Sequence, residues 1–207
     1  MSTRPSLDFK RLNHLDNLLI NTIGKPGQLP GVQVLVWRRG DLSYFRWAGL
    51  RDIERGLPIE QDTIFRIYSM TKPIVSVALL MLLEEGRFRL DTPASELLPK
   101  FSELEVYAGM DEKTGEMKTE ACKRPVTIHQ LLTHTSGLTY EMHAEHHPVA
   151  KLYKQSSAER APLSLEGMVN HLMNFPLAYQ PGTRWHYSVS TDVCARLVEI
   201  ISGESID

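Results

Sequence analysis

The first part of the chain carries apolar side chains at helical spacing. Within residues 7–23 the apolar positions recur every three to four residues, at Phe9, Leu12, Leu15, Leu19 and Ile23. This period predicts an amphipathic helix that covers another element with one face. Gly24 and Pro26 follow directly and are expected to end the helix.

Strand-like runs come next. Residues 32–37 and 42–48 are rich in β-branched and aromatic side chains and are separated by the turn-like sequence Arg-Arg-Gly-Asp, which predicts an antiparallel hairpin. The polar stretch 49–62, interrupted by glycine and proline, is expected to be a loop. Residues 64–68 are expected to form a third short strand.

From residue 69 onward the pattern is mainly helical. Residues 70–85 are apolar on nearly every side and are followed by Gly86, which predicts a buried central helix. Three more helices are predicted, each behind a residue that can cap its N-terminus: Thr127, Ser164, and Thr191 or Asp192, the last helix ending at Gly203.

The order of these elements predicts a mixed α/β protein of the α+β type. Residues 102–125 and 139–162 are expected to be surface loops, so the sheet has only two or three strands. A sheet of so few strands is expected to continue in further chain, and a small complete α+β domain is the alternative.

Composition and charge exclude several classes of protein. The 207 residues include 23 basic and 25 acidic side chains, for a net charge of −2, and 42% are hydrophobic. These values argue against a disordered chain and against a basic nucleic-acid-binding protein. The length predicts one domain, or part of one.

Targeting and redox features are few. The N-terminus lacks the apolar core of a secretory signal, and the apolar stretch 75–83 is too short to span a bilayer. Cys122 and Cys194 match no metal or redox spacing and are expected to be plain thiols. We therefore expect a cytoplasmic protein without a membrane partner.

The leading candidate for chemistry is Ser69-Met70-Thr71-Lys72, at the start of the apolar helix. The free N–H groups of a helix N-terminus favour the negative charge that develops on an attacked acyl group. Lys72 falls on the same helix face as Ser69, and burial among apolar neighbours would let its amine act as a base. S-x-x-K is a short pattern, and the plain interpretation is a capping serine with a surface lysine.

Two other segments carry candidate side chains. Tyr187 follows a Pro-Gly turn and precedes a helix, where a nearby lysine would let it carry a proton, although such a tyrosine is more often a core aromatic. His134 belongs to a Thr-His-Thr-Ser-Gly turn that we interpret as structural. His143, His146 and His147 have the spacing of metal ligands, but without an accompanying carboxylate they are interpreted as a solvated loop.

Three segments taken together, 64–93, 126–138 and 181–193, resemble the serine β-lactamase and penicillin-binding-protein superfamily, most closely its class C-like branch and the family VIII carboxylesterases. The resemblance covers about residues 9–207. It implies that Ser69 is the acylated nucleophile, Lys72 its activating partner and Tyr187 a proton carrier.

The resemblance also implies that residues 1–207 are the N-terminal portion of one such domain. Residues 1–68 would supply a helix and the first sheet strands, and 69–207 the mainly helical region. The oxyanion hole of the family combines the N–H of the nucleophile, here Ser69, with an N–H from a strand that this chain lacks. No metal or organic cofactor is implied.

The chain departs from the family pattern in two ways. The tyrosine motif reads Tyr187-Ser188-Val189, with valine where β-lactamases of this branch usually carry asparagine. Because valine offers no amide hydrogen bonds, the departure favours simple esters over β-lactams, and Val189→Asn is expected to raise β-lactam turnover. The third family motif, a K-T-G, H-x-G or W-G-G strand, is absent.

The sequence thus predicts a serine hydrolase that cleaves small carboxylic esters through an acyl-enzyme, with weak β-lactam hydrolysis as a side activity. One alternative is a β-lactamase, D-alanyl carboxypeptidase or acyltransferase of the same superfamily. The other is a catalytically inactive truncated module, and we expect low activity from these 207 residues alone. A small ester is the expected partner, and the oligomeric state is left open.

Overall fold

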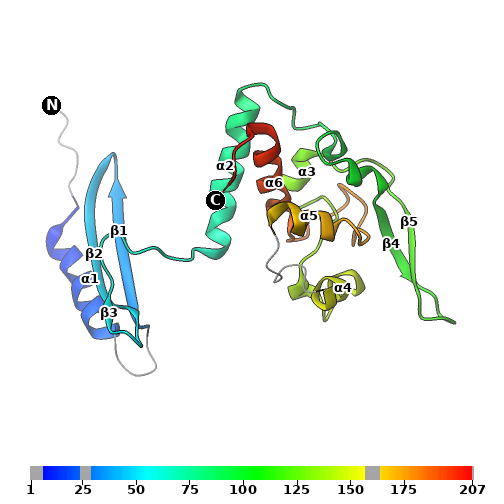
Figure 1. The fold of residues 1–207 in the computed structure, drawn as a ribbon. Coiled ribbons are helices and arrows are strands. Elements are labelled where there is room, and N and C mark those ends of the chain that lie inside the picture. Colours follow the sequence, from blue (N-terminus) through cyan, green and yellow to red (C-terminus); the bar gives the residue numbers. More distant parts are fainter. Residues whose placement is uncertain (1–6, 24–28, 157–163, 207) are drawn as a thin grey trace. The chain divides into compact units, whose positions relative to one another are not determined.

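The computed structural model describes residues 7–23, 29–156 and 164–206 (Figure 1). The chain divides into two compact units, residues 1–66 and residues 67–207. Both combine helices with antiparallel strands, which is the predicted α+β class.

The first unit is a helix on a small antiparallel sheet. It contains α1 (Phe9–Thr22), β1 (Gly31–Arg38), β2 (Asp41–Asp52) and β3 (Leu57–Pro58), with the strands in the order β1-β2-β3. α1 packs on β2, and the hydroxyl of the buried Tyr44 donates to Asp16 Oδ1 at 2.7 Å. The predicted helix and hairpin are confirmed, whereas the predicted helix stop at Gly24 and Pro26 lies outside the described residues.

The third predicted strand is wrong. Residues 63–67 are irregular, and Tyr68 begins a 3₁₀ turn instead. The side chain of Ile64 is 95% exposed, so the apolar pattern of this segment meets no neighbouring strand. The short strand β3 pairs with β2 inside the stretch that was expected to be a loop. Backbone pairing alone forms this two-residue strand, so its side chains show no strand pattern in the sequence.

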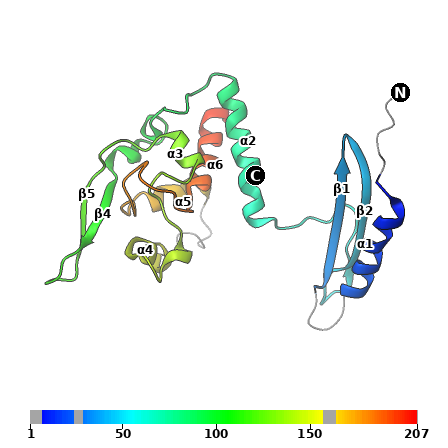
Figure 2. The same ribbon diagram turned by 180° about the vertical axis from the view of Figure 1, so that it is seen from behind.

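The second unit is mainly helical, with one hairpin. Its elements are η1 (Tyr68–Met70), α2 (Thr71–Glu84), η2 (Ala94–Glu96), η3 (Pro99–Glu103), β4 (Glu105–Met110), β5 (Met117–Ala121), α3 (Ile128–Leu132), η4 (Glu141–His143), α4 (Pro148–Ser156), α5 (Leu165–Leu172) and α6 (Ser190–Ser202). Helices α2 and α6 lie side by side in both views (Figures 1 and 2).

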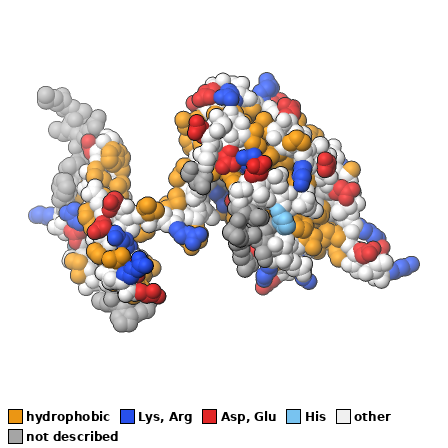
Figure 3. Space-filling model, viewed as in Figure 1, with side chains coloured by type: hydrophobic (Ala, Val, Ile, Leu, Met, Phe, Trp, Pro, Cys, Tyr) orange, Lys and Arg blue, Asp and Glu red, His pale blue; other side chains and the backbone are white. Residues whose placement is uncertain are grey.

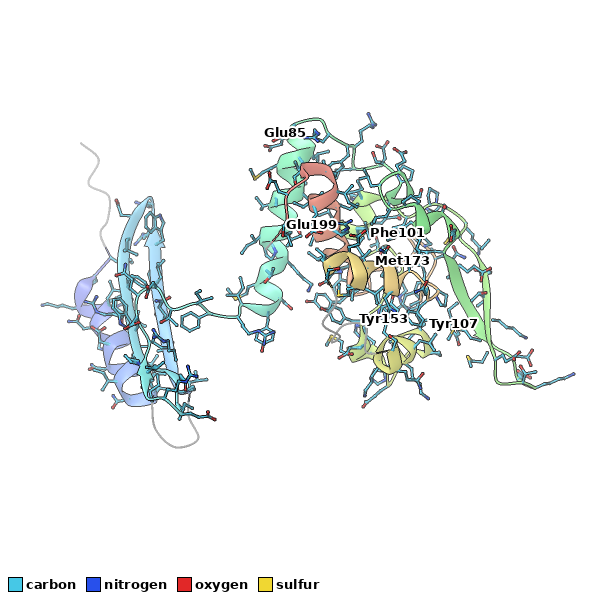
Figure 4. The ribbon with its side chains drawn as sticks, viewed as in Figure 1. Glu85, Phe101, Tyr107, Tyr153, Met173 and Glu199 are labelled. Atoms are coloured by element: carbon cyan, nitrogen blue, oxygen red, sulfur yellow. The ribbon has the colours of Figure 1, made fainter. Side chains whose placement is uncertain are left out.

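The core of this unit draws side chains from every part of it. Phe101 of η3, Tyr153 of α4 and Met173 after α5 are among its buried members (Figure 4). The longest helix contributes Val75, Leu79 and Leu82. Side chains of both α2 and α6 belong to this core, which therefore holds the two helices together.

The prediction that α2 is buried on nearly every side is wrong. One face packs into the core, but Ile74, Val77 and Met81 are 61%, 56% and 58% exposed. Helical spacing places these three on a face that α6 does not cover. Apolar side chains are accordingly visible on the surface of the molecule (Figure 3).

Two predicted surface loops contain regular structure. Within 102–125, β4 and β5 form a hairpin in which Val106 is 1% exposed, and the Tyr107 N–H donates to the Leu177 carbonyl at 2.8 Å. Within 139–162, η4 and α4 are formed, while residues 157–162 lie outside the described residues. The apolar positions that build these elements are too few to show a clear period in the sequence.

The predicted helix starts are mostly confirmed. Thr127 caps α3 in a capping box with Gln130, and Ser164 caps α5. α6 begins earlier than expected, at Ser190, so Thr191 and Asp192 lie in its first turn and do not cap it. Gly203 ends α6 in a left-handed conformation, as predicted. No helix in the described ranges is long and apolar enough to cross a membrane.

Substitution of Gly137 by alanine tests how tightly the turn after α3 is packed. Its φ is +92°, and an added Cβ would lie 2.1 Å from the Tyr179 carbonyl oxygen. Gly137→Ala is expected to lower the free energy of unfolding by more than about 2 kcal/mol, because both the backbone and the close contact are strained. Urea unfolding measures the loss.

Gly115→Ala is the matched control. Its φ is +70°, and nothing lies within 4 Å of the added Cβ, so only the backbone term of about 1 kcal/mol applies. Equal losses for the two variants would contradict the packing described for Gly137.

Candidate active site

Ser69 lies in the 3₁₀ turn that leads into α2. The turn η1 ends at Met70 and α2 begins at Thr71, so Ser69 precedes the helix proper by two residues. Tyr68 before it has a φ of +48°, a left-handed conformation that a bulky side chain rarely adopts. The turn exposes Ser69 to solvent instead of burying it as a cap.

Tyr187 reaches Ser69 from a distant part of the chain. It lies in the segment that enters α6, and its hydroxyl is 2.8 Å from Ser69 Oγ across a separation of 118 residues. The C-terminal ends of the two helices also meet, since Arg87 Nη2 donates to the Ile201 carbonyl at 2.7 Å. α2 and α6 therefore run in the same direction, with Ser69 and Tyr187 at the same end of the pair.

Lys72 lies over two aromatic rings. Its Nζ is 5.1 Å from the centroid of the Tyr187 ring and 5.5 Å from that of Tyr140. The two rings are stacked, with centroids 5.7 Å apart and planes 9° from parallel. Aromatic faces attract a lysine side chain at this distance, so the two rings position Lys72 beside Tyr187.

This environment differs from the predicted one. Lys72 was expected to be buried among apolar side chains, but it is only half-buried, and Ile74 and Val77 on its helix are exposed. The sequence placed Lys72 on a helix that is apolar all round, whereas only one face of α2 is covered. The lysine instead meets the aromatic pair, whose second ring the sequence analysis did not identify.

The environment of Tyr187 favours its ionised form. The hydrogen bond with Ser69 contributes most to lowering the pKa of Tyr187, burial opposes this, and hydrogen bonding and charge from Lys72 lower it further. A phenol whose pKa is lowered is ionised in a larger fraction near neutral pH, and only the ionised form can accept a proton. The three residues predicted as candidates are thus brought together by the structure.

The turn after α3 holds the Tyr187 segment. The N–H of His186 donates to the His134 carbonyl at 2.8 Å, and the N–H of Val189 donates to the Thr139 carbonyl at 3.1 Å. The His134 ring packs against the Tyr187 ring, with centroids 4.9 Å apart. The turn was predicted to be structural, and these contacts show that it supports the segment that carries Tyr187.

Buried hydroxyls extend this support. Ser188 Oγ lies 3.3 Å from His134 Nδ1 and 2.7 Å from Ser190 Oγ, which is 2.7 Å from Ser136 Oγ. Ser136, Ser188 and Ser190 are fully buried. Since buried hydroxyls must be paired, this chain fixes the backbone on both sides of Tyr187.

The sequence predicts a solvated loop for His143, His146 and His147, and this is confirmed for the exposed His146 but wrong for His143 and His147. The His143 ring lies 4.4 Å from the His186 ring, its Nε2 is 3.1 Å from the Tyr187 carbonyl oxygen, and His147 is buried. Burial, with a smaller effect of the neighbouring histidines, lowers the pKa of His186 to about 4. In the described part of the chain, no group of three or more His, Cys, Asp or Glu could hold a metal ion.

Val189 has a different role from the predicted one. Its side chain is 1% exposed and belongs to the core, and its backbone precedes the first turn of α6. A side chain buried to this extent offers no surface to a substrate, so the interpretation of Val189 as a substrate-selecting residue is wrong. An asparagine here would place an amide in the core, where it would need hydrogen-bond partners.

An open pocket of about 770 Å³ adjoins Ser69. The side chains around it that carry polar groups include Lys72, Tyr140, Asp192, Arg196 and Glu199 (the last labelled in Figure 4). The sequence indicates Asp192 only as a helix cap and does not indicate Tyr140. Neither Asp192 nor Tyr140 belongs to a periodic pattern or a short motif that would have indicated a place in the pocket.

Comparisons with known proteins identify relatives of this fold. Esterase EstB of Burkholderia gladioli is 34% identical over 180 residues, which are 86% of this chain and 43% of EstB. Among solved structures, EstCE1, described as a hydrolase with promiscuous acyltransferase activity, is similar with a TM-score of 0.73 and 27% identity, covering 95% of this chain and 48% of EstCE1.

A second structure is the unliganded simvastatin synthase LovD of Aspergillus terreus, with a TM-score of 0.68 and 30% identity over 86% of this chain and 45% of LovD. The chain spans less than half the length of these relatives. A family model described as Beta-lactamase matches residues 18–207. The chain therefore belongs to the beta-lactamase family, with an esterase-like relation to EstB and EstCE1.

Proposed function

We propose that the protein containing this chain is a serine hydrolase of small carboxylic esters. The observation that carries the proposal is the 2.8 Å contact between Ser69 Oγ and the Tyr187 hydroxyl, with Lys72 beside both and an open pocket in front. A nucleophile within hydrogen-bond reach of a base that is itself oriented by a third group is the arrangement that acyl transfer requires.

The reaction would proceed in two halves. Ser69 Oγ attacks the ester carbonyl carbon while its proton passes to Tyr187, whose ionised form Lys72 stabilises, and the tetrahedral intermediate then loses the alcohol, which takes that proton back. In the second half, water attacks the acyl group on Ser69 with Tyr187 again accepting a proton, and the acid leaves. The N–H of Ser69, in the turn that precedes α2, would stabilise the oxyanion.

Acyl transfer to an alcohol other than water is the second candidate. EstCE1 is described as a hydrolase with acyltransferase activity, and LovD as a synthase. The pocket beside Ser69 is open to solvent, so a second alcohol could reach the acyl group as water does. The chemistry on Ser69 is the same, and only the acceptor differs.

Several expectations from the sequence remain proposals. We propose that residues 1–207 are the N-terminal portion of one β-lactamase-related domain, and that the protein is cytoplasmic, with Cys122 and Cys194 as free thiols. Weak β-lactam hydrolysis as a side activity, and the absence of a nucleic-acid partner, are proposed on the same basis. Val189 no longer supports the preference for esters over β-lactams.

Covalent labelling tests the nucleophile. After incubation with a fluorophosphonate, intact-mass spectrometry and peptide mapping of the full-length protein are expected to show one adduct, on Ser69, and none in Ser69→Ala. Ser102→Ala removes an exposed serine whose hydroxyl donates to the Pro99 carbonyl, and this control should label as the wild type does. An adduct that persists in Ser69→Ala would overturn the assignment.

The proton carrier is tested by removing one oxygen atom. Tyr187→Phe keeps the ring that stacks on Tyr140 but loses the group that accepts the Ser69 proton, so we expect acylation by p-nitrophenyl acetate to slow by about a hundredfold or more. Stopped-flow release of p-nitrophenol measures this rate.

Tyr44→Phe is the control for loss of a hydrogen-bonded tyrosine hydroxyl, because Tyr44 bonds Asp16 in the other unit. It should acylate at the wild-type rate. A Tyr187→Phe enzyme as fast as this control would exclude Tyr187 as the proton acceptor.

A further inference from the structure

The peptide group that follows Tyr187 is bonded by two histidine side chains. Its carbonyl oxygen, which belongs to Tyr187, lies 3.1 Å from His143 Nε2, and its N–H, which belongs to Ser188, donates to His134 Nδ1 at 3.3 Å. His143 is the last residue of η4, whereas His134 lies in the turn after α3. Two separate segments of the chain therefore reach the two polar groups of one peptide.

The chemistry of the partners fixes what each histidine does. A carbonyl oxygen can only accept a hydrogen bond, so His143 Nε2 carries a proton and donates to Tyr187. An amide N–H can only donate, so His134 Nδ1 is unprotonated and accepts from Ser188. Burial, with a smaller effect of the Lys72 charge, lowers the pKa of His134, as suits an acceptor nitrogen. One histidine is thus a donor and the other an acceptor.

The groups on either side of this peptide have backbone partners. The N–H of His186 donates to the His134 carbonyl at 2.8 Å, and the N–H of Val189 donates to the Thr139 carbonyl at 3.1 Å. Bonds between backbone groups remain when a side chain is replaced, whereas the two bonds to the peptide between them do not. A turn of that peptide changes the backbone torsion at Tyr187, and with it the direction of the Tyr187 side chain.

His134 has a backbone conformation that residues other than glycine rarely adopt. Its φ is +54°, in the left-handed region. Such a conformation costs free energy and persists only where the surrounding structure holds it. In this conformation the His134 carbonyl accepts from His186 and its ring accepts from Ser188. One residue therefore binds the chain on both sides of Tyr187.

We propose that His134 and His143 are positioning residues for Tyr187: by holding the peptide between Tyr187 and Ser188, they keep the Tyr187 hydroxyl against Ser69 Oγ. The inference deepens the proposed function and rests on it for its consequence in catalysis. Neither histidine takes up the proton of Ser69. Because a displacement of about 1 Å can slow a reaction about a hundredfold, their hydrogen bonds affect the rate through Tyr187.

The competing explanation is packing alone. The His143 ring lies 4.4 Å from the His186 ring, and the His134 ring lies 4.9 Å from the Tyr187 ring. Packing of this kind depends on the size and shape of a side chain and not on a donor or acceptor atom. The two explanations differ in whether a side chain that keeps only the hydrogen bond keeps Tyr187 in place.

The ionisation of Tyr187 reports on its position without any substrate. The hydrogen bond with Ser69 contributes most to lowering the pKa of Tyr187, so loss of that contact should move the titration of Tyr187 to higher pH. NMR of the full-length protein with 13C-labelled tyrosine measures this titration, and the Tyr187 signal is the one absent in Tyr187→Phe. We expect the upward shift in His143→Met, which has no donor, but not in His143→Gln, which has a similar length and keeps an N–H.

A second pair of variants tests the acceptor. Asparagine and glycine both tolerate the left-handed conformation of His134, but only asparagine offers an oxygen that can accept from the Ser188 N–H. The titration of Tyr187 should therefore move to higher pH in His134→Gly and stay near that of the wild type in His134→Asn. His146→Met changes an exposed histidine close to His143 and is the control that should leave the titration unmoved.

The acylation rate gives the consequence for catalysis. In His143→Met and His134→Gly we expect acylation by saturating p-nitrophenyl acetate to slow by about tenfold to a hundredfold, because the hydroxyl of Tyr187 is displaced from Ser69. The ester concentration that gives half the maximal rate should change little. His143→Gln and His134→Asn should recover most of the lost rate, and His146→Met should acylate as the wild type does.

The outcomes distinguish the two proposals. A wild-type protein that does not hydrolyse esters, with a Tyr187 titration that moves in His143→Met and His134→Gly only, would reject the proposed function and keep the positioning role. Hydrolysis with a titration unmoved in all four variants, or moved equally in His143→Met and His143→Gln, would reject the positioning role and keep the function. If His134→Gly does not fold, the two His143 variants decide the question.

Discussion

The parallel packing of α2 on α6 is the constraint on which the site depends. Ser69 immediately precedes one helix and Tyr187 closely precedes the other, so the contact between their hydroxyls exists only while the two N-terminal ends lie together. The apolar face of α2 that includes Leu79 supplies the burial that holds this pair. Arg87 on the Ile201 carbonyl fixes the opposite end and so prevents a shift along the helix axes.

Charge is organised around one lysine. Lys72 lies over the rings of Tyr140 and Tyr187 and also acts on the buried carboxylate of Asp192. The charge of Lys72 lowers the pKa of Tyr187, so a larger fraction of Tyr187 is ionised near neutral pH. We therefore propose Tyr187 as the group that moves the proton.

The support of this site is polar but uncharged. The segment that carries Tyr187 is held by backbone hydrogen bonds to the turn at 134–139 and by a row of buried serine hydroxyls. The histidines beside it are packed against one another, and burial keeps His186 neutral at physiological pH by lowering its pKa to about 4. These hydrogen bonds from uncharged groups hold the Tyr187 segment in place and add no charge next to Lys72.

The sequence alone determined most helices, the first hairpin and the α+β class, and it indicated Ser69, Lys72 and Tyr187 as candidates, because periodicity, caps and short motifs are local properties. It could not determine which face of α2 is covered, that residues 64–68 form no strand, or that Val189 belongs to the core. Nor could it identify Tyr140 or Asp192 as neighbours of Lys72. Burial and proximity depend on which distant segments meet, and only the tertiary structure brings together side chains from α2, the turn after α3 and the start of α6.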